Sequence, residues 1–215
     1  MIVGVSVGGR PIEAFDVAGT EAAEGLGALV FGAIHGDEPG SAELCRRFVD
    51  GLRARPPRYR TIVIPVANPD GLAAGRKNNA RDVDLNRNFA ARNWVRAHDQ
   101  GYDPGPTPAS EPETVALVAL IERWQPRALV AVHQPFRCVN WDGSGQGLAD
   151  GMAARCGYPS VASVGYPTPG SFGSRYGVDD GRCVVTLELP RPVPDADWPG
   201  LLLALRCCTI FPPAG

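Results

Sequence analysis

The residues from Leu29 to Glu43 place the strongest constraint on the fold of this chain. They begin with a short apolar run, typical of a buried strand, which stops at His35-Gly36-Asp37-Glu38. Pro39 comes next, and the first turn of a helix accepts proline because the missing N–H would have no partner there. Apolar residues then recur on one helical face, at Leu44, Phe48 and Leu52. The sequence therefore predicts a strand, a turn and a helix, with His35 at the carboxyl end of the strand and Glu38 in the turn.

His35 and Glu38 are candidate metal ligands. An imidazole and a carboxylate on the two sides of such a turn can converge on one divalent ion. Open α/β sheets also place their ligand sites at the carboxyl ends of strands. The alternative is an acid at a helix N-terminus beside a surface histidine. Because the pattern is short, the pair by itself leaves both interpretations open.

Composition argues against several classes of protein. The 215 residues can bury a substantial core, and a net charge of −2 gives no electrostatic footprint for nucleic acid or anionic lipid. No apolar run approaches the roughly 20 residues of a membrane-spanning helix. Residues Met1–Val7 lack the features of a secretion signal and predict a first strand instead. The six cysteines show no zinc-type spacing, and without a secretion signal we expect reduced thiols in a cytoplasmic protein. From the charge and the apolar runs we expect no nucleic-acid or membrane partner.

Strands alternate with helical patterns along the rest of the chain. After a hairpin at the N-terminus, the predicted strands are Thr61–Ala67, Ala128–His133 and Cys183–Pro190, and the predicted helices lie between Ser110 and Trp124, over Leu148–Cys156 and over Pro199–Cys208. Long irregular stretches run over 72–94, 99–110 and 165–177. The alternation predicts an α/β fold with a mixed, largely parallel central sheet flanked by helices. We expect a single domain over residues 1–215, whose oligomeric state the sequence leaves open.

His133 provides a third candidate ligand, because the apolar strand from Ala128 also stops at a histidine. Two histidines and one carboxylate, with a fourth position left for water, form a catalytic zinc set. Zinc in such a site polarises a carbonyl and lowers the pKa of its bound water to about 7. Asp37 could compete with Glu38 as the ligand. Glu38 is preferred because a residue three positions after His35 can reach round the turn to the same ion. Asp37 is then expected to form a hydrogen bond with one of the ligands rather than to bind the metal itself.

Glu188 is an acid inside an otherwise apolar strand. Burying a carboxylate there is costly unless the charge is paired with a cation or has a function in a site. Near a metal, Glu188 could take a proton from bound water and pass it to the leaving amine. The alternative is a buried salt bridge with Arg182 or Arg137.

Arg76, Asn86 and Arg87 lie in the long polar stretch after the Asn68-Pro69-Asp70-Gly71 turn. An arginine fork binds a carboxylate through two parallel hydrogen bonds, and an asparagine amide adds a third donor. A second arginine near a metal could stabilise the oxyanion that forms when water attacks a carbonyl. The alternative is a solvated loop whose charges face water.

The order of these motifs resembles that of the zinc metallocarboxypeptidase family. The matching motifs, which cover most of the chain, are His35-Gly36-Asp37-Glu38, Asn68-Pro69-Asp70-Gly71, Arg76-Lys77-Asn78, Asp84-Leu85-Asn86-Arg87-Asn88-Phe89, Ser110-Glu111-Pro112-Glu113-Thr114, Val132-His133-Gln134-Pro135 and Thr186-Leu187-Glu188. Within the family, residues 165–174 and 186–190 resemble the bacterial murein peptide amidase A branch in particular.

This resemblance implies a carboxypeptidase-like catalytic domain and a role for each matching residue. The ligands of one Zn2+ would be His35, Glu38 and His133; Arg76 would polarise the scissile carbonyl, Asn86 and Arg87 would bind the free carboxylate of a small peptide substrate, and Glu188 would be the general base. Enzymes of that branch cleave the bond between γ-D-glutamate and meso-diaminopimelate in wall peptides recycled in the cytoplasm. Pancreatic-type members cover the substrate with a tyrosine on a mobile loop. Tyr166 and Tyr176 flank the corresponding loop, and the resemblance does not choose between them, so no catalytic tyrosine is assigned.

Diaminopimelate carries a second amino-acid centre, which needs polar partners of both signs. The candidates near the site are Asp142, Asp179, Asp180, Arg137 and Arg175. Two other functions stay open. One is a zinc deacylase of N-acyl amino acids, of the succinylglutamate desuccinylase or aspartoacylase type, which has a related motif order. The other is an inactive module that binds wall peptides.

Overall fold

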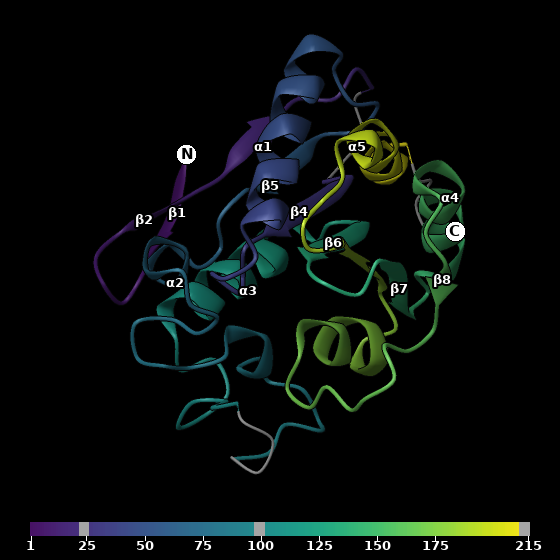
Figure 1. Ribbon diagram of the computed structural model, residues 1–215. Coiled ribbons are helices and arrows are strands. Elements are labelled where there is room, and N and C mark those ends of the chain that lie inside the picture. The colour runs from purple at the N-terminus through teal and green to yellow at the C-terminus, as the bar shows by residue number, and fades with distance from the viewer. Residues whose placement is uncertain (22–25, 97–101, 211–215) are drawn as a thin grey trace.

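A central β-sheet with helices on both faces forms the frame of the protein in a computed structural model that describes residues 1–21, 26–96 and 102–210 (Figure 1). Within these residues, the strand order of the large sheet is β3-β5-β4-β6-β9-β7-β8, and β1 and β2 pair separately. The strands are β1 (Ile2–Val5), β2 (Pro11–Glu13), β3 (Phe15–Val17), β4 (Ala28–Gly32), β5 (Thr61–Ile64), β6 (Ala128–His133), β7 (Cys138–Gly143), β8 (Ser160–Val161) and β9 (Cys183–Glu188). The helices are α1 (Pro39–Ala54), α2 (Pro69–Ala74), α3 (Pro112–Trp124), α4 (Gln146–Cys156) and α5 (Trp198–Cys208), with shorter helical turns at Leu85–Arg87, Gly173–Asp179 and Asp195–Asp197.

The middle of the large sheet is parallel. Strands β5, β4, β6 and β9 run in one direction, whereas β3 and β7 run antiparallel to β5 and β9. Every residue of β4, β5 and β6 is buried, as expected for parallel strands that are covered on both faces. The predicted mixed, largely parallel sheet with flanking helices is confirmed. The extent of the domain, residues 1–215, stays a prediction.

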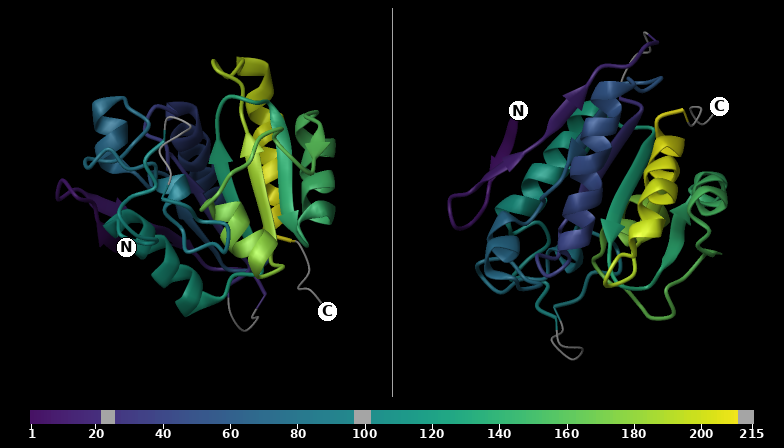
Figure 2. Two further views of the ribbon diagram at one scale, coloured as in Figure 1. Left: turned by 90° about the horizontal axis from the view of Figure 1, so that it is seen from below. Right: turned by 45° about the horizontal axis from the view of Figure 1, so that its top comes forward.

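Helices cover the sheet in two layers (Figure 2). On one face, Phe48 of α1, Met152 of α4 and Leu205 of α5 belong to one hydrophobic cluster with Val30 of β4. On the other face, α3 and the loops pack around Phe31, the next residue of the same strand. Successive residues of a strand point to opposite faces, which explains why the apolar run of β4 is uninterrupted. None of the helices described is both long and apolar enough to cross a membrane.

The carboxyl ends of β4, β6 and β9 meet at one edge of the sheet. Gly32, the last residue of β4, pairs with Val132 of β6, and His133 at the end of β6 pairs with Glu188 at the end of β9. Paired strands lie about 4.8 Å apart. The chain segments that follow β4 and end β6 and β9 therefore carry their side chains to a common point.

Several elements were not predicted from the sequence, among them β8 and the helical turns Leu85–Arg87 and Asp195–Asp197. Strand β7 was not predicted, because it lacks the uninterrupted apolar run by which β4, β6 and β9 were recognised, although Val139 and Trp141 alternate there with Asn140 and Asp142. Helix α2 begins in the expected turn, where Asn68 Oδ1 accepts the Gly71 N–H at 2.8 Å. The predicted irregular stretch 165–177 contains the start of a helical turn, Gly173–Asp179. Part of the predicted irregular stretch 99–110 lies outside the described residues.

Candidate metal centre

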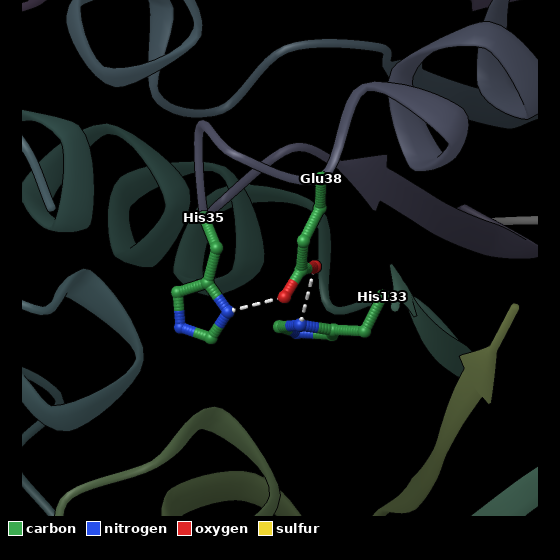
Figure 3. Close-up of side chains that lie close together, drawn as sticks. All are labelled: His35, Glu38 and His133. Atoms are coloured by element: carbon green, nitrogen blue, oxygen red, sulfur yellow. Dashed lines mark hydrogen bonds and ion pairs between the residues drawn. The ribbon is translucent and has the colours of Figure 1, made fainter. Parts of the chain in front are cut away.

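Two side chains from the turn after β4, His35 and Glu38, meet His133 from the end of β6 at the carboxyl edge of the sheet (Figure 3). The carboxylate of Glu38 lies between two imidazole rings, with Oε1 2.8 Å from Nδ1 of His35 and Oε2 3.1 Å from Nδ1 of His133. One ligand atom from each residue lies within 4.8 Å of the other two, and all three residues are buried. Two imidazole nitrogens and one carboxylate oxygen are the protein donors of a catalytic zinc site. The structure thus brings together the three residues that were predicted as ligands.

Hydrogen bonds hold Glu38 at the start of α1. Its main-chain oxygen accepts the hydroxyl of Ser41 at 2.6 Å, and the same hydroxyl oxygen accepts the N–H of Ala33 at 2.8 Å. The side-chain Oε2 accepts the N–H of Gln134 at 3.1 Å, directly after β6. The ligand turn is therefore fixed to both of the strands that carry the histidines.

Gly36 lets the His35 turn pack against the start of α2. A Cβ atom at this position would lie only 2.0 Å from the carbonyl carbon of Gly71, so a larger residue would push the two segments apart. Asn68 connects the same segments, because its Nδ2 donates to the carbonyl oxygen of Ile34 at 3.2 Å. These contacts fix the backbone on both sides of His35.

The charges of the cluster shift its pKa values. Burial disfavours the charged imidazole of His35, but hydrogen bonds and charges from Asp84 and Glu38 outweigh it and raise the pKa of His35 to about 9. Burial also disfavours the carboxylate of Glu38, but the charges and hydrogen bonds of His133 and His35 lower its pKa to about 2. A divalent ion among these side chains would supply the positive charge and displace the proton.

Asp84 contacts His35 on the side of the ring opposite Glu38. Its Oδ1 lies 3.1 Å from Nε2 of His35, the nitrogen that points away from Glu38, and its side chain is fully buried. A carboxylate in this position orients the ring and makes the other nitrogen a better ligand. Asp84, rather than Asp37, therefore makes the hydrogen bond to a ligand that the sequence led us to expect. The sequence signal was the Asp84-Leu85-Asn86-Arg87 motif, in which only the last two residues were assigned a role.

Glu188 ends β9 with its carboxylate at the site. It is buried, and its Oε2 accepts the N–H of Phe136 at 3.4 Å. Burial raises the pKa of Glu188, the charge of His133 opposes this effect, and the charge of Glu38 adds to it. The predicted alternative, a salt bridge with an arginine, is not formed with any described residue: Arg182 donates to Pro126 O, and Arg137 pairs with Asp197.

A cavity of about 320 Å3 opens in front of the cluster. Asn86 and Arg87, from the helical turn Leu85–Arg87, line it together with Glu188. Asn86 Oδ1 accepts the N–H of Phe172 at 3.0 Å, which ties this turn to the loop on the opposite wall. Arg87 is buried, donates from Nη1 to its neighbour's carbonyl at 2.8 Å, and forms no ion pair with a described carboxylate.

Arg76 lies outside this cavity. Its side chain is exposed, and its Nη2 donates to the carbonyl oxygen of Asn79 at 2.8 Å. The next residue, Lys77, lines the cavity instead, with Nζ 2.6 Å from Oδ2 of Asp84. Of the seven residues named as site candidates, Arg76 is thus the one that the structure does not bring to the cluster.

Among the candidates for a substrate side chain, only Asp142 lines the cavity. Arg175 pairs with Asp180, and Asp179 accepts the N–H of Arg92, away from the site. The two tyrosines of the 165–177 stretch also differ. Tyr166 lines the cavity beside Phe136, with ring centroids 5.9 Å apart, whereas Tyr176 is buried in the core.

Comparison with known proteins identifies the family. The zinc carboxypeptidase family model matches residues 1–144, and the chain belongs to this family. It is therefore a hydrolase; the family implies zinc, and the His35–Glu38–His133 cluster could hold such an ion. The predicted resemblance to zinc metallocarboxypeptidases is confirmed.

Relatives place the chain within the family. It is 38% identical over 174 residues to murein peptide amidase A of Escherichia coli K12, which covers 75% of this chain and 70% of the relative. It is 32% identical over 199 residues to murein peptide amidase A of Vibrio campbellii, which covers 87% of this chain and 77% of the relative. The resemblance to this branch is confirmed as well.

Solved structures show the same fold. Murein-tripeptide amidase MpaA from Escherichia coli O157 matches with a TM-score of 0.81 and 32% identity, over 100% of this chain and 93% of that one. Carboxypeptidase A from Helicoverpa armigera matches with a TM-score of 0.77 and 17% identity, over 98% of this chain and 68% of that one. The predicted carboxypeptidase-like fold is confirmed.

Proposed function

We propose that this protein is a cytoplasmic zinc amidase that removes the C-terminal residue of murein peptides by cleaving the γ-D-glutamyl–meso-diaminopimelate bond. The names of its relatives support the substrate class, because the two murein peptide amidases and the murein-tripeptide amidase share about a third of their residues with it. We further propose that one Zn2+ is bound by His35, Glu38 and His133.

The unpaired charge of Arg87 is the observation that carries this proposal. A buried guanidinium without a carboxylate partner is costly, so it implies an anionic ligand. Arg87 lies in the cavity that also contains the metal cluster, and the described residues provide no carboxylate within ion-pair distance. The NH2 group of Asn86 forms no hydrogen bond with a described residue and is a second donor for the same anion. A peptide with a free terminal carboxylate fits both groups and places its last amide bond near the cluster.

In the proposed mechanism, the terminal carboxylate binds to Arg87 and Asn86 and so orients the scissile amide. When bound, zinc polarises the amide carbonyl and makes a water molecule acidic. Glu188 accepts a proton from the attacking water and donates it to the departing amine. Burial of Glu188 supports this role, because it raises the pKa of the carboxyl and so makes it a better proton acceptor once ionised.

Asp142 supports diaminopimelate as the residue that is released. Asn140 and Asp142 lie on the face of β7 that borders the cavity. In the antiparallel pair of β7 and β9, Cys138 is opposite Glu188, so Asp142 lies four residues further along β7 from the proposed general base. Asp142 is half-buried and forms no ion pair or side-chain hydrogen bond with a described residue, and burial raises its pKa. A substrate side chain that ends in an ammonium group would pair with this carboxylate, as the distal amine of diaminopimelate can.

The test is to incubate the zinc-loaded protein with L-Ala-γ-D-Glu-meso-diaminopimelate and to measure free diaminopimelate by mass spectrometry. Stoichiometric metal and release of diaminopimelate are expected. Hydrolysis of N-acyl amino acids without release of diaminopimelate would favour the deacylase alternative. Binding of the tripeptide without any hydrolysis would favour the inactive binding module.

A further inference from the structure

We propose that Lys77, and not Arg76, supplies the positive charge that stabilises the oxyanion formed when water attacks the scissile carbonyl. This inference rests on the proposed hydrolysis of a C-terminal amide. It changes the assignment that the motif order alone suggests, because Arg76 and Lys77 are neighbours and only one of them reaches the cavity.

The composition of the chain makes Lys77 unusual. The sequence contains 20 arginines and one lysine, so nearly every position that needs a positive charge has arginine. Lys77 is that one lysine, and it lies in the cavity of the metal cluster. A lysine ammonium is a compact point charge with three N–H donors on a flexible stem, whereas a guanidinium is a planar fork. The exception to the arginine bias thus falls where a small, mobile cation fits a single oxygen atom.

The backbone of Lys77 is fixed to the turn that carries the ligands. Its carbonyl oxygen accepts the N–H of Gly36 at 3.0 Å and the side-chain amide of Asn68 at 3.2 Å. Gly36 directly follows His35, so the stem of Lys77 begins beside the first ligand. Of the Arg76-Lys77 pair, Lys77 lines the cavity, whereas the Nη2 of Arg76 donates to the carbonyl oxygen of Asn79.

The side chain of Lys77 joins the cluster through Asp84. Nζ lies 2.6 Å from Oδ2 of Asp84, and Oδ1 of Asp84 lies 3.1 Å from His35. The Lys77 side chain is 43% exposed, so it reaches the open cavity although Asp84 is fully buried. One ion-pair contact leaves N–H groups of the ammonium for a substrate oxygen. Of the other cations lining the cavity, Arg87 faces the proposed carboxylate site and Arg191 lies 3.7 Å from Asp37.

The same contacts allow a purely positioning role, in which Lys77 only holds Asp84 and thereby His35. The two roles differ in what they do to the metal. Loss of a residue that orients a ligand weakens metal binding by about 10- to 100-fold. Loss of an oxyanion donor lowers kcat by about 100- to 1,000-fold and leaves the metal in place.

The experiment compares Lys77→Met, Lys77→Arg and Arg76→Met in the zinc-loaded enzyme. For Lys77→Met we expect kcat to fall by about 100- to 1,000-fold, with KM and the zinc dissociation constant changing less than about 3-fold. Lys77→Arg keeps the charge and should recover part of the lost kcat at unchanged zinc affinity. Arg81→Met is the control, because this exposed arginine lies in the same loop and only forms a 3.5 Å contact with Glu111. Zinc affinity is measured by competition with a chelator, and melting curves verify folding.

Three results would overturn the proposal: an active Lys77→Met enzyme, a loss of zinc affinity that parallels its loss of activity, or a comparable loss of kcat in Arg76→Met. Hydrolysis of the tripeptide by the unchanged enzyme is measured first, so its absence would refute the proposed substrate separately. The Lys77 comparison would then use hippuryl-L-lysine, which has a free terminal carboxylate for Arg87 and a side-chain ammonium group for Asp142. If the unchanged enzyme hydrolyses neither, the inference for Lys77 is also wrong.

Discussion

Replacing Arg87 by Met tests the carboxylate site most directly. Methionine keeps an apolar stem of similar length and removes the guanidinium, which is buried and is free of described carboxylates. The Cζ atom lies 4.9 Å from the ring centroid of Tyr102, and a methionine side chain can keep an apolar contact with that ring. Melting curves of the variant verify that it folds. The enzyme would then lose the cation that fixes the end of the substrate.

The structure sets the size of the effect. Because Arg87 is only 6% exposed, its hydrogen bonds to a substrate carboxylate would form with little competition from water. A buried charge pair of this kind contributes about 2–5 kcal/mol when one partner is removed. At about 1.4 kcal/mol per tenfold change, kcat/KM should fall by about 30- to 4,000-fold. The loss should come mainly from KM, because the carboxylate keeps its charge in the transition state.

The assay is a double-mutant cycle in which one change is made in the enzyme and the other in the substrate. The unchanged enzyme and Arg87→Met are each given the tripeptide and its analogue with a terminal carboxamide, and kcat/KM is measured for the four combinations. We expect the unchanged enzyme to prefer the acid strongly and the variant to lose that preference, since both changes remove the same contact. Arg92→Met is the control, an exposed arginine in the same stretch of chain. A variant that keeps the full preference for the acid would refute the assignment of Arg87.

Three further changes test the other parts of the site and the fold. Glu188→Gln should lower kcat by about 100- to 10,000-fold while zinc stays bound, as shown by activity and metal analysis; a normal kcat would remove Glu188 from proton transfer. Asp142→Asn should lower kcat/KM for the diaminopimelate peptide by about 10- to 100-fold and spare a peptide ending in norleucine, since one charge-assisted contact is worth about 1.5–3 kcal/mol; equal losses would contradict a side-chain contact. Asp70 accepts hydrogen bonds from Gly8 N and Arg10 at 2.7 and 2.6 Å, and these donors outweigh burial and lower its pKa. The stability from this ionised carboxylate is present above the unfolded pKa of about 3.9 and is lost as pH falls through the lower folded value, so melting temperatures should fall less between pH 5 and pH 3 in Asp70→Asn than in the unchanged protein.

The parts of the fold that follow from local pattern were predictable. Apolar runs that stop at a polar residue identified β4, β6 and β9, because parallel strands that are buried on both faces are apolar at nearly every position. Since the ends of parallel strands share an edge, His35, His133 and Glu188 could be expected to meet there. Strand β7 escaped prediction because one of its faces borders the cavity and carries Asn140 and Asp142. A strand shaped by a binding site does not show the apolar pattern of a core strand.

Contacts that depend on the direction of individual side chains in the long loop were not predictable. Asp84 and Lys77 lie in a stretch without periodicity, where no regular structure fixes which residue faces inward. Arg76 and Lys77 both carry a positive charge, so residue type cannot choose between them. The backbone of Lys77 is fixed by a hydrogen bond from Gly36, 41 positions away, and it is Lys77 whose side chain lines the cavity. A motif therefore indicates that a cation belongs beside the metal, whereas only the packing of the ligand turn against the loop determines which side chain it is.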